Sequence, residues 1–176
     1  MSFPLPAALV CLDLQRGRAD DLPQEAAPVI AACRHVLEEA RRRRWPVLHA
    51  HRREASVEAS RPLAGLEPLP VEPVYVRPGP SAFSHQAFAQ AARGLGGPLA
   101  LIGLSLCDTV LATTFAAADR KLPVEILLDA VFATPQDEEV ARRAIAASVA
   151  AATACRFIHS GELFRQEAAL VAANAP

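Results

Sequence analysis

The sequence predicts an α/β protein with a three-layer, doubly wound and mostly parallel sheet, and two observations carry this prediction. Short apolar runs bounded by glycine or proline alternate with longer segments of helical spacing, which is typical of strands joined by crossover helices. The expected strands are apolar almost throughout, as in strands that are buried on both faces. In such sheets ligands bind beyond the carboxyl ends of the strands, where the winding reverses.

The first half of the chain follows this alternation. Residues 7–14 form the first expected strand, which ends at the carboxylate of Asp13, and a helix is expected over Gln24–Arg44. A second strand covers residues 47–51. Residues 52–73 are polar and then proline-rich, and they are expected to lack regular structure.

The second half repeats the pattern. An extended segment at 74–76 leads to a proline–glycine turn and to a helix that Ser81 is placed to cap. A strand is expected at 99–102, and a turn at Gly103 connects it to a helix whose periodic pattern ends near Lys121. Further strands are expected at 124–129 and 155–159, and further helices at 137–154 and 161–173.

The turn after Gly103 is the centre of the expected site. A strand, a glycine turn and a helix in succession place the backbone N–H groups of residues 105–109 at a positive helix end, which suits a negative oxygen of a ligand or transition state. Asp13, His51 and Arg77 stand at the ends of other strands. Because these ends share one edge of a parallel sheet, we expect the polar side chains to meet the turn there.

The composition narrows the function classes. A chain of 176 residues is most simply one domain, 1–176, with a formal net charge of −1 that gives no reason to expect nucleic acid or an anionic membrane as partner. No apolar block reaches the length of a membrane span and no secretory signal is recognisable, so a cytoplasmic location is expected. The four cysteines lack CxxC spacing, which indicates neither a zinc knuckle nor a disulfide framework.

Four segments carry a family resemblance through their order and spacing: CLDLQ at 11–15, RPGPSAF at 77–83, GLSLCDTVLATTFAAADRKLPV at 103–124 and LLDAVFA at 127–133. With them the chain resembles the isochorismatase-like hydrolases, also called the cysteine hydrolase superfamily, which includes nicotinamidases, N-carbamoylsarcosine amidases and isochorismatases. The resemblance covers nearly the whole chain. It implies a Rossmann-like winding, a cis peptide at Leu104–Ser105 and a homo-oligomer, either a dimer or a tetramer, and no cofactor is expected.

The same resemblance implies a catalytic triad in which two of three positions differ here. Asp13 occupies the position of the family's aspartate, Arg77 stands in place of its lysine, and Thr109 stands in place of its nucleophilic cysteine. A register slipped by two residues would make Cys107 the nucleophile, but the downstream landmarks match without a gap only when Thr109 holds that position. Cysteine-dependent amide hydrolysis is therefore not expected.

The two replacements weaken the chemistry in a definable way. A threonine hydroxyl attacks only when a base removes its proton, and Asp13 is the available base. A guanidinium nearby stabilises the ionised carboxylate and so weakens that base, and arginine, unlike lysine, cannot release its own proton.

Two hypotheses remain. The first is a hydrolase that acts without a cysteine on a small polar or carboxylated substrate: Asp13 handles the proton, Arg77 holds the anionic end, and the amides of residues 105–109 stabilise developing charge. The second is a catalytically inactive family member that binds a small molecule or regulates. The side chains or backbone expected to bind the ligand in either case are Gln15, His51, Phe83, Ser105 and Leu106.

His49 and His51 lie on the same side of their strand because strand side chains alternate. Nicotinamidases bind a metal with residues near this position. No clear third ligand follows His51, and two ligands are too few for zinc, so no metal is predicted and these histidines are only weak candidates.

Overall fold

A computed structural model describes residues 5–20 and 22–173. Its centre is a six-stranded sheet with the order β3-β2-β1-β4-β5-β6, and every neighbouring pair is parallel. The predicted fold class is confirmed. The strands are β1 (Ala8–Leu12), β2 (Val47–Arg52), β3 (Val74–Arg77), β4 (Leu99–Gly103), β5 (Val124–Val131) and β6 (Cys155–Ile158).

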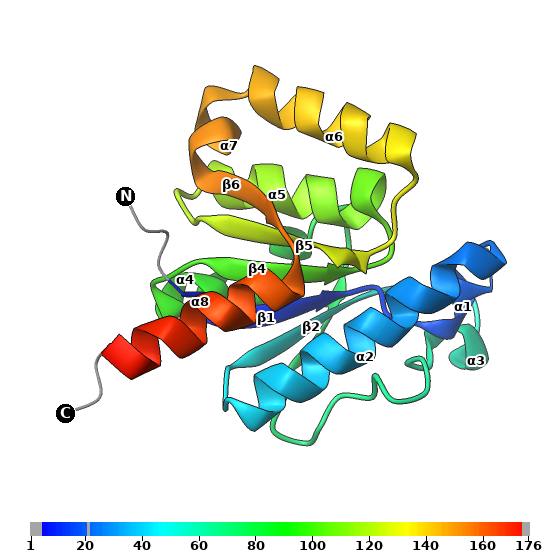
Figure 1. The fold of residues 1–176 in the computed structure, drawn as a ribbon. Coiled ribbons are helices and arrows are strands. Elements are labelled where there is room, and N and C mark those ends of the chain that lie inside the picture. The colour runs from blue at the N-terminus through cyan, green and yellow to red at the C-terminus, as the bar shows by residue number, and fades with distance from the viewer. Residues whose placement is uncertain (1–4, 21, 174–176) are drawn as a thin grey trace.

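Helices cover both faces of the sheet and produce three layers (Figure 1). The pair α2 and α8 packs on one face, and α4, α5, α6 and α7 pack on the other. The helices are α1 (Arg16–Ala19), α2 (Ala27–Arg42), α3 (Val57–Ser60), α4 (Gln86–Leu95), α5 (Leu111–Ala118), α6 (Pro135–Ala147), α7 (Val149–Ala154) and α8 (Ser160–Ala173), with shorter turns η1 (Gln24–Ala26), η2 (Ala82–Ser84) and η3 (Leu106–Val110).

The core is divided by strand alternation. Leu9 and Cys11 of β1 pack toward α2, whereas Val10 and Leu12 pack toward α4 and α5, and all four are fully buried. Burial on both faces explains why this strand is apolar throughout. None of the helices in the described part of the chain has the length and apolar character that a membrane crossing requires.

The winding reverses between β1 and β4, and the chain leaves both strands through constrained turns. Gly103 has a φ of 143°, and a Cβ on it would lie 2.1 Å from the carbonyl oxygen of Leu12, so only glycine fits. The peptide bond between Leu104 and Ser105 is cis, as the resemblance implied. Asp13, just beyond β1, has a φ of 52° and so turns the chain directly at the strand end.

Several predicted boundaries differ from the structure. The helix predicted over 137–154 is two helices, because Ser148 is extended (φ −103°, ψ 110°) and its Oγ accepts a hydrogen bond from the N–H of Ala151 in α7. The first of the two begins at Pro135 because Thr134 and Asp137 form a capping box. Local capping therefore overrides the continuous alanine-rich pattern.

Two short helices were not predicted. Helix α1 follows β1 directly, and α3 lies within residues 52–73, where Ser56 caps it by accepting from the N–H of Ala59 at 3.0 Å. Ser81 does cap a helical turn, but that turn is η2, and α4 starts separately at Gln86. A single helical turn has too few residues to show a periodic pattern, so helices this short can be recognised in a sequence only from their capping residues.

The proline-rich segment that precedes β3 is tied to the sheet by Glu72. Its carboxylate accepts two hydrogen bonds of 2.8 Å from Arg41 of α2, one of 2.9 Å from His49 of β2 and one of 2.9 Å from the N–H of Leu69. The carboxylate thus joins a helix, a strand and a loop, which gives an irregular segment a fixed position.

Candidate active site

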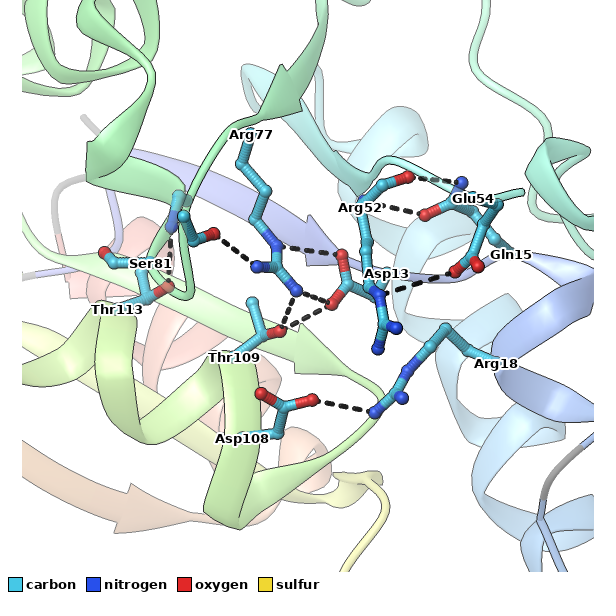
Figure 2. A network of polar contacts seen from close by, with 12 residues as sticks. Asp13, Gln15, Arg18, Arg52, Glu54, Arg77, Ser81, Asp108, Thr109 and Thr113 are labelled. Carbon is cyan, nitrogen blue, oxygen red and sulfur yellow. Dashed lines mark hydrogen bonds and ion pairs between the residues drawn. The ribbon is translucent and has the colours of Figure 1, made fainter. Parts of the chain in front are cut away.

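Three side chains from distant parts of the chain meet at the carboxyl edge of the sheet (Figure 2). Arg77 donates from Nε to Asp13 Oδ1 at 3.1 Å and from Nη2 to Asp13 Oδ2 at 2.5 Å. The hydroxyl of Thr109 donates to the same Oδ2 at 2.5 Å, and Arg77 Nη2 donates to the Thr109 oxygen at 2.6 Å. The acid, the guanidinium and the hydroxyl therefore form one closed hydrogen-bonded triad.

Each member is positioned by a different element. Asp13 follows β1, and its N–H donates to the carbonyl of Ala50 at 2.9 Å. Arg77 is the last residue of β3. Thr109 lies in η3, where Asp108 interrupts the helical backbone with φ −108° and ψ −109°. Parallel strands bring these ends to one edge, as the sequence predicted for Asp13 and Arg77.

Almost all hydrogen-bonding groups of the triad have partners within the protein. Asp13 and Thr109 are 0% exposed and Arg77 is 7% exposed. Arg77 also donates from Nη1 to the carbonyl of Gly79 at 2.5 Å, so four of the five N–H groups of its guanidinium have protein partners. The sequence predicted that Arg77 holds the anionic end of a ligand, but its guanidinium has only one N–H group left without a partner among the described residues.

An open hollow of about 390 Å³ lies beside the triad. Arg77 is the only triad member in its lining, and Asp108 projects into the lining while pairing with Arg18 of α1 at 2.8 Å. Figure 2 shows the side chains of Arg18 from α1 and Arg52 from β2 directed toward the triad. The complete lining is Arg52, Arg53, Arg77, Pro78, Gly79, Pro80 and Asp108.

Several backbone N–H groups of the turn after Gly103 already donate hydrogen bonds within the protein. The N–H of Leu106 donates to the carbonyl of Phe132 at 2.9 Å, and the Leu106 side chain is fully buried. The N–H groups of Asp108 and Val110 both point to the carbonyl of Ser105 at 3.4 Å. The row of free donors expected over residues 105–109 is thus partly engaged in holding the turn together.

Two expected binding residues have structural partners. The Gln15 side chain donates to the carbonyl of Arg52 at 3.0 Å and accepts from the Arg52 N–H at 2.8 Å, which fixes the end of β2. Phe83 is buried, packs edge-on against Phe88 at 5.1 Å and lies under the guanidinium of Arg120 at 5.0 Å. Neither residue lines the hollow.

The two histidines do not form a metal site. His49 Nε2 lies 2.9 Å from Glu72, and the rings of His49 and His51 stand 6.0 Å apart. Burial lowers the pKa of His49; burial and neighbouring His49 lower the pKa of His51 to about 4, although Asp13 acts in the opposite direction. Within residues 5–20 and 22–173 no three His, Cys, Asp or Glu side chains are grouped to hold a metal, so the donor set does not fit zinc.

Cys107 is exposed and lies outside the triad. Its thiol donates to the carbonyl of Asp137 at 3.3 Å, and partial burial together with the charge of Asp137 raises its pKa. A raised pKa leaves less thiolate at neutral pH, which is the opposite of what activates a nucleophilic cysteine. Thr109, and not Cys107, is the residue of this turn that hydrogen-bonds to Asp13.

Four charged residues at the hollow were missed from the sequence: Arg18, Arg52, Arg53 and Asp108. Arg52 and Arg53 follow His51 at the end of β2, so the strand-end argument that selected His51 applied equally to them. Arg18 carried no such signal, because it belongs to a helix too short to be recognised. Asp108 carried none either, because it lies in η3 and not at the end of a strand.

Together, the fold and this edge define a doubly wound α/β protein with a polar site at the switch point of the sheet. The chain matches the isochorismatase domain over residues 7–155, and it belongs to the isochorismatase family. A search of curated protein sequences finds no significant match.

Solved structures share the fold at low identity. An isochorismatase family protein from Desulfovibrio vulgaris is 22% identical with a TM-score of 0.78, over 96% of this chain and 100% of that one. The N-carbamoylsarcosine amidase of Thermoplasma acidophilum is 20% identical with a TM-score of 0.73, over 89% of this chain and 97% of that one. A zinc-bound pyrazinamidase from Pyrococcus horikoshii is 17% identical with a TM-score of 0.72, over 86% of this chain and 98% of that one.

Proposed function

We propose that this chain is a hydrolase with a divergent active site, which acts without a cysteine nucleophile on a small polar or carboxylated substrate. The observation that carries the proposal is the convergence of Asp13, Arg77 and Thr109 within 2.5–3.1 Å of one another. Two of the structural relatives are named as amidases, which supports hydrolysis as the reaction type.

The proton path follows from the hydrogen bonds. Thr109 points its hydroxyl proton at Asp13 Oδ2, and Arg77 donates to the Thr109 oxygen. As that oxygen attacks a substrate carbonyl carbon, its proton passes to Asp13 and the new negative charge lies on the former carbonyl oxygen. When this intermediate collapses, the leaving group departs with the proton from Asp13, and water then releases the acyl group from Thr109 by the same path.

Arginine at position 77 limits the substrates that can react. Both oxygens of Asp13 already accept hydrogen bonds from the guanidinium, which, unlike the ammonium group of lysine, cannot release a proton to a leaving group. Activated esters react without a proton on the leaving group, whereas amides need one. We therefore expect esterase activity to exceed amidase activity.

One observation favours a second candidate. Asp13 and Thr109 are fully buried and hydrogen-bonded within the protein, so the same triad suits a binding or regulatory protein in which the ion pair only holds the site together. In that case small carboxylates would raise the melting temperature and no member of a substrate panel would be turned over.

A substrate panel decides between the two. It contains isochorismate, simple amides and simple esters, and it compares wild type with Asp13→Asn after matched thermal melts. We expect ester hydrolysis that falls about 100-fold in Asp13→Asn, as is typical for loss of an acid–base group. Turnover that survives unchanged in a folded Asp13→Asn variant would exclude the proposed mechanism.

A further inference from the structure

The lining of the hollow carries more positive charge than the protein neutralises. Of its three arginines, Arg77 is paired with Asp13, and the one lining carboxylate, Asp108, is paired with Arg18. Among the described residues, the one carboxylate that pairs with Arg52 is that of Glu54, at 3.9 Å. For Arg53, which is exposed, no carboxylate lies within ion-pair distance among the described residues. Two guanidinium groups of the lining are therefore available to a ligand.

The position of Arg52 is fixed at the end of β2. It is the register partner of Arg77 across the parallel strands β2 and β3, so the two arginines lie on neighbouring strands at the same level. The charge of Arg77 is offset by Asp13, whereas that of Arg52 is not closely offset. Gln15 binds both the N–H and the carbonyl of Arg52, so the backbone cannot turn this residue away.

These observations identify the chemistry of the ligand. Guanidinium groups bind carboxylate and phosphate through paired hydrogen bonds, and two of them at one mouth suit two negative charges. A volume of about 390 Å³ is in the range of small-molecule sites. Arg77 lies in the same lining and donates a hydrogen bond to the buried Thr109, so it connects this anion site to the triad.

We propose that Arg52 and Arg53 form an anion site that selects a compact organic dianion, and that they determine substrate specificity for the hydrolysis proposed above. This inference rests on that proposed function for its catalytic consequence, but the binding step stands on the arginines alone. Arg77 then acts as the clamp on Asp13, and the anionic end of the substrate is held by Arg52 and Arg53 instead.

The test measures binding and uses a charge ladder. Succinate, its monoamide and its diamide have nearly the same shape and carry two, one and no negative charges at neutral pH. Titration calorimetry with wild type is expected to give an affinity that falls about tenfold or more with each lost charge, and that weakens as salt is added. Equal binding of the three compounds, or no binding of succinate, would overturn the proposal.

Matched variants locate the site. Arg53→Gln and Arg52→Gln should each weaken succinate binding about tenfold, whereas Arg93→Gln, which removes an exposed arginine of α4 outside the lining, should leave it unchanged. Arg53 is exposed and past the end of β2, so its variant tests the proposal even if Arg52→Gln fails to fold. Succinate binding that is insensitive to Arg53→Gln would refute the site.

The outcome separates this proposal from the preceding one. Arginine-dependent succinate binding with no turnover of any panel compound supports the anion site and removes the hydrolase. Turnover of panel esters together with succinate binding that neither arginine variant weakens supports the hydrolase and removes the anion site.

Discussion

At the scale of single residues, position 77 decides what the site can do. An arginine holds both oxygens of Asp13 and still reaches Thr109 and Gly79, which a single ammonium group could not do with the same geometry. The resemblance assigns lysine to this position. The exchange therefore favours a rigid, neutralised triad over one in which a proton moves freely.

This interpretation predicts a gain of function. The double variant Thr109→Cys with Arg77→Lys should hydrolyse activated esters about tenfold or more faster than wild type, because a thiolate at a helix start is a strong nucleophile and lysine can give up its proton. Nitrophenyl acetate hydrolysis, followed spectroscopically, measures this, and Thr109→Cys alone is the control. A double variant that folds and remains no faster than wild type would mean that Thr109 does not hold the nucleophile position.

The residue pattern predicted part of the site. Asp13 and Arg77 could be found because they stand at the ends of strands, whereas Thr109 was found only through the family resemblance, which places the nucleophile six residues after Gly103. The partners of Gln15 and Phe83 could not be found, because a hydrogen bond to a distant backbone or a ring contact leaves no local pattern. Their assignment to ligand binding stays a prediction without support from the geometry.

At the scale of elements, Glu72 explains how an irregular segment is held. Burial tends to raise the pKa of Glu72, but hydrogen bonds from Arg41, from the Leu69 N–H and from His49 outweigh it and lower the pKa to about 2. A folded-state pKa below the unfolded value means that this carboxylate stabilises the fold fully above the unfolded pKa. The contribution is lost as the pH falls through the folded pKa.

The prediction for Glu72→Gln follows directly. Near neutral pH the variant should lose about 2 kcal/mol of unfolding free energy, because it leaves Arg41 without its carboxylate. Between about pH 5 and pH 2 the wild type should lose stability faster than the variant, so the two curves converge. Urea unfolding across this range measures both effects, with Glu38→Gln on the exposed face of α2 as the control. Parallel curves for wild type and Glu72→Gln would contradict the account.

Element boundaries were predictable only where a periodic pattern ended at a strong signal. Strand β4 ends at Gly103 as expected, since glycine and the following turn interrupt the apolar run. The break at Ser148 was not predicted, because a single serine in an alanine-rich run does not by itself end a helical pattern, and only its extended backbone and its cap in the structure distinguish it.

At the scale of the whole molecule, the homo-oligomer implied by the resemblance stays a prediction. We expect a neighbouring subunit to pack on the proline-rich segment 62–80. Val71, Val74 and Val76 in this segment are 87%, 44% and 47% exposed, and the last two lie on β3, an edge strand with one open side. Exposed valines beside an open strand edge favour contact with a second copy of the chain.

Light scattering after size exclusion tests this prediction. We expect a mass of two or four chains for wild type and a shift to one chain in Val74→Glu with Val76→Glu, because charges on an edge strand oppose pairing. Val140→Glu, which alters an exposed valine of α6, should leave the mass unchanged. A wild-type mass of one chain at micromolar concentration would contradict the prediction.

The fold of the whole molecule was predictable because its strands are apolar and its connections short, so one parallel winding accommodates them. The charge of the hollow was not, because it arises from register pairs such as Arg52 and Arg77, which only the assembled sheet creates.

The central claim is that Asp13 and Thr109 act as one catalytic unit, and a double-mutant cycle on kcat/KM tests it most directly. With the best ester of the panel, Asp13→Asn and Thr109→Val should each lower kcat/KM about 100-fold, and the double variant should fall little further, because groups that share one step are not additive. Losses that multiply in the double variant, or single variants as active as wild type, would contradict it.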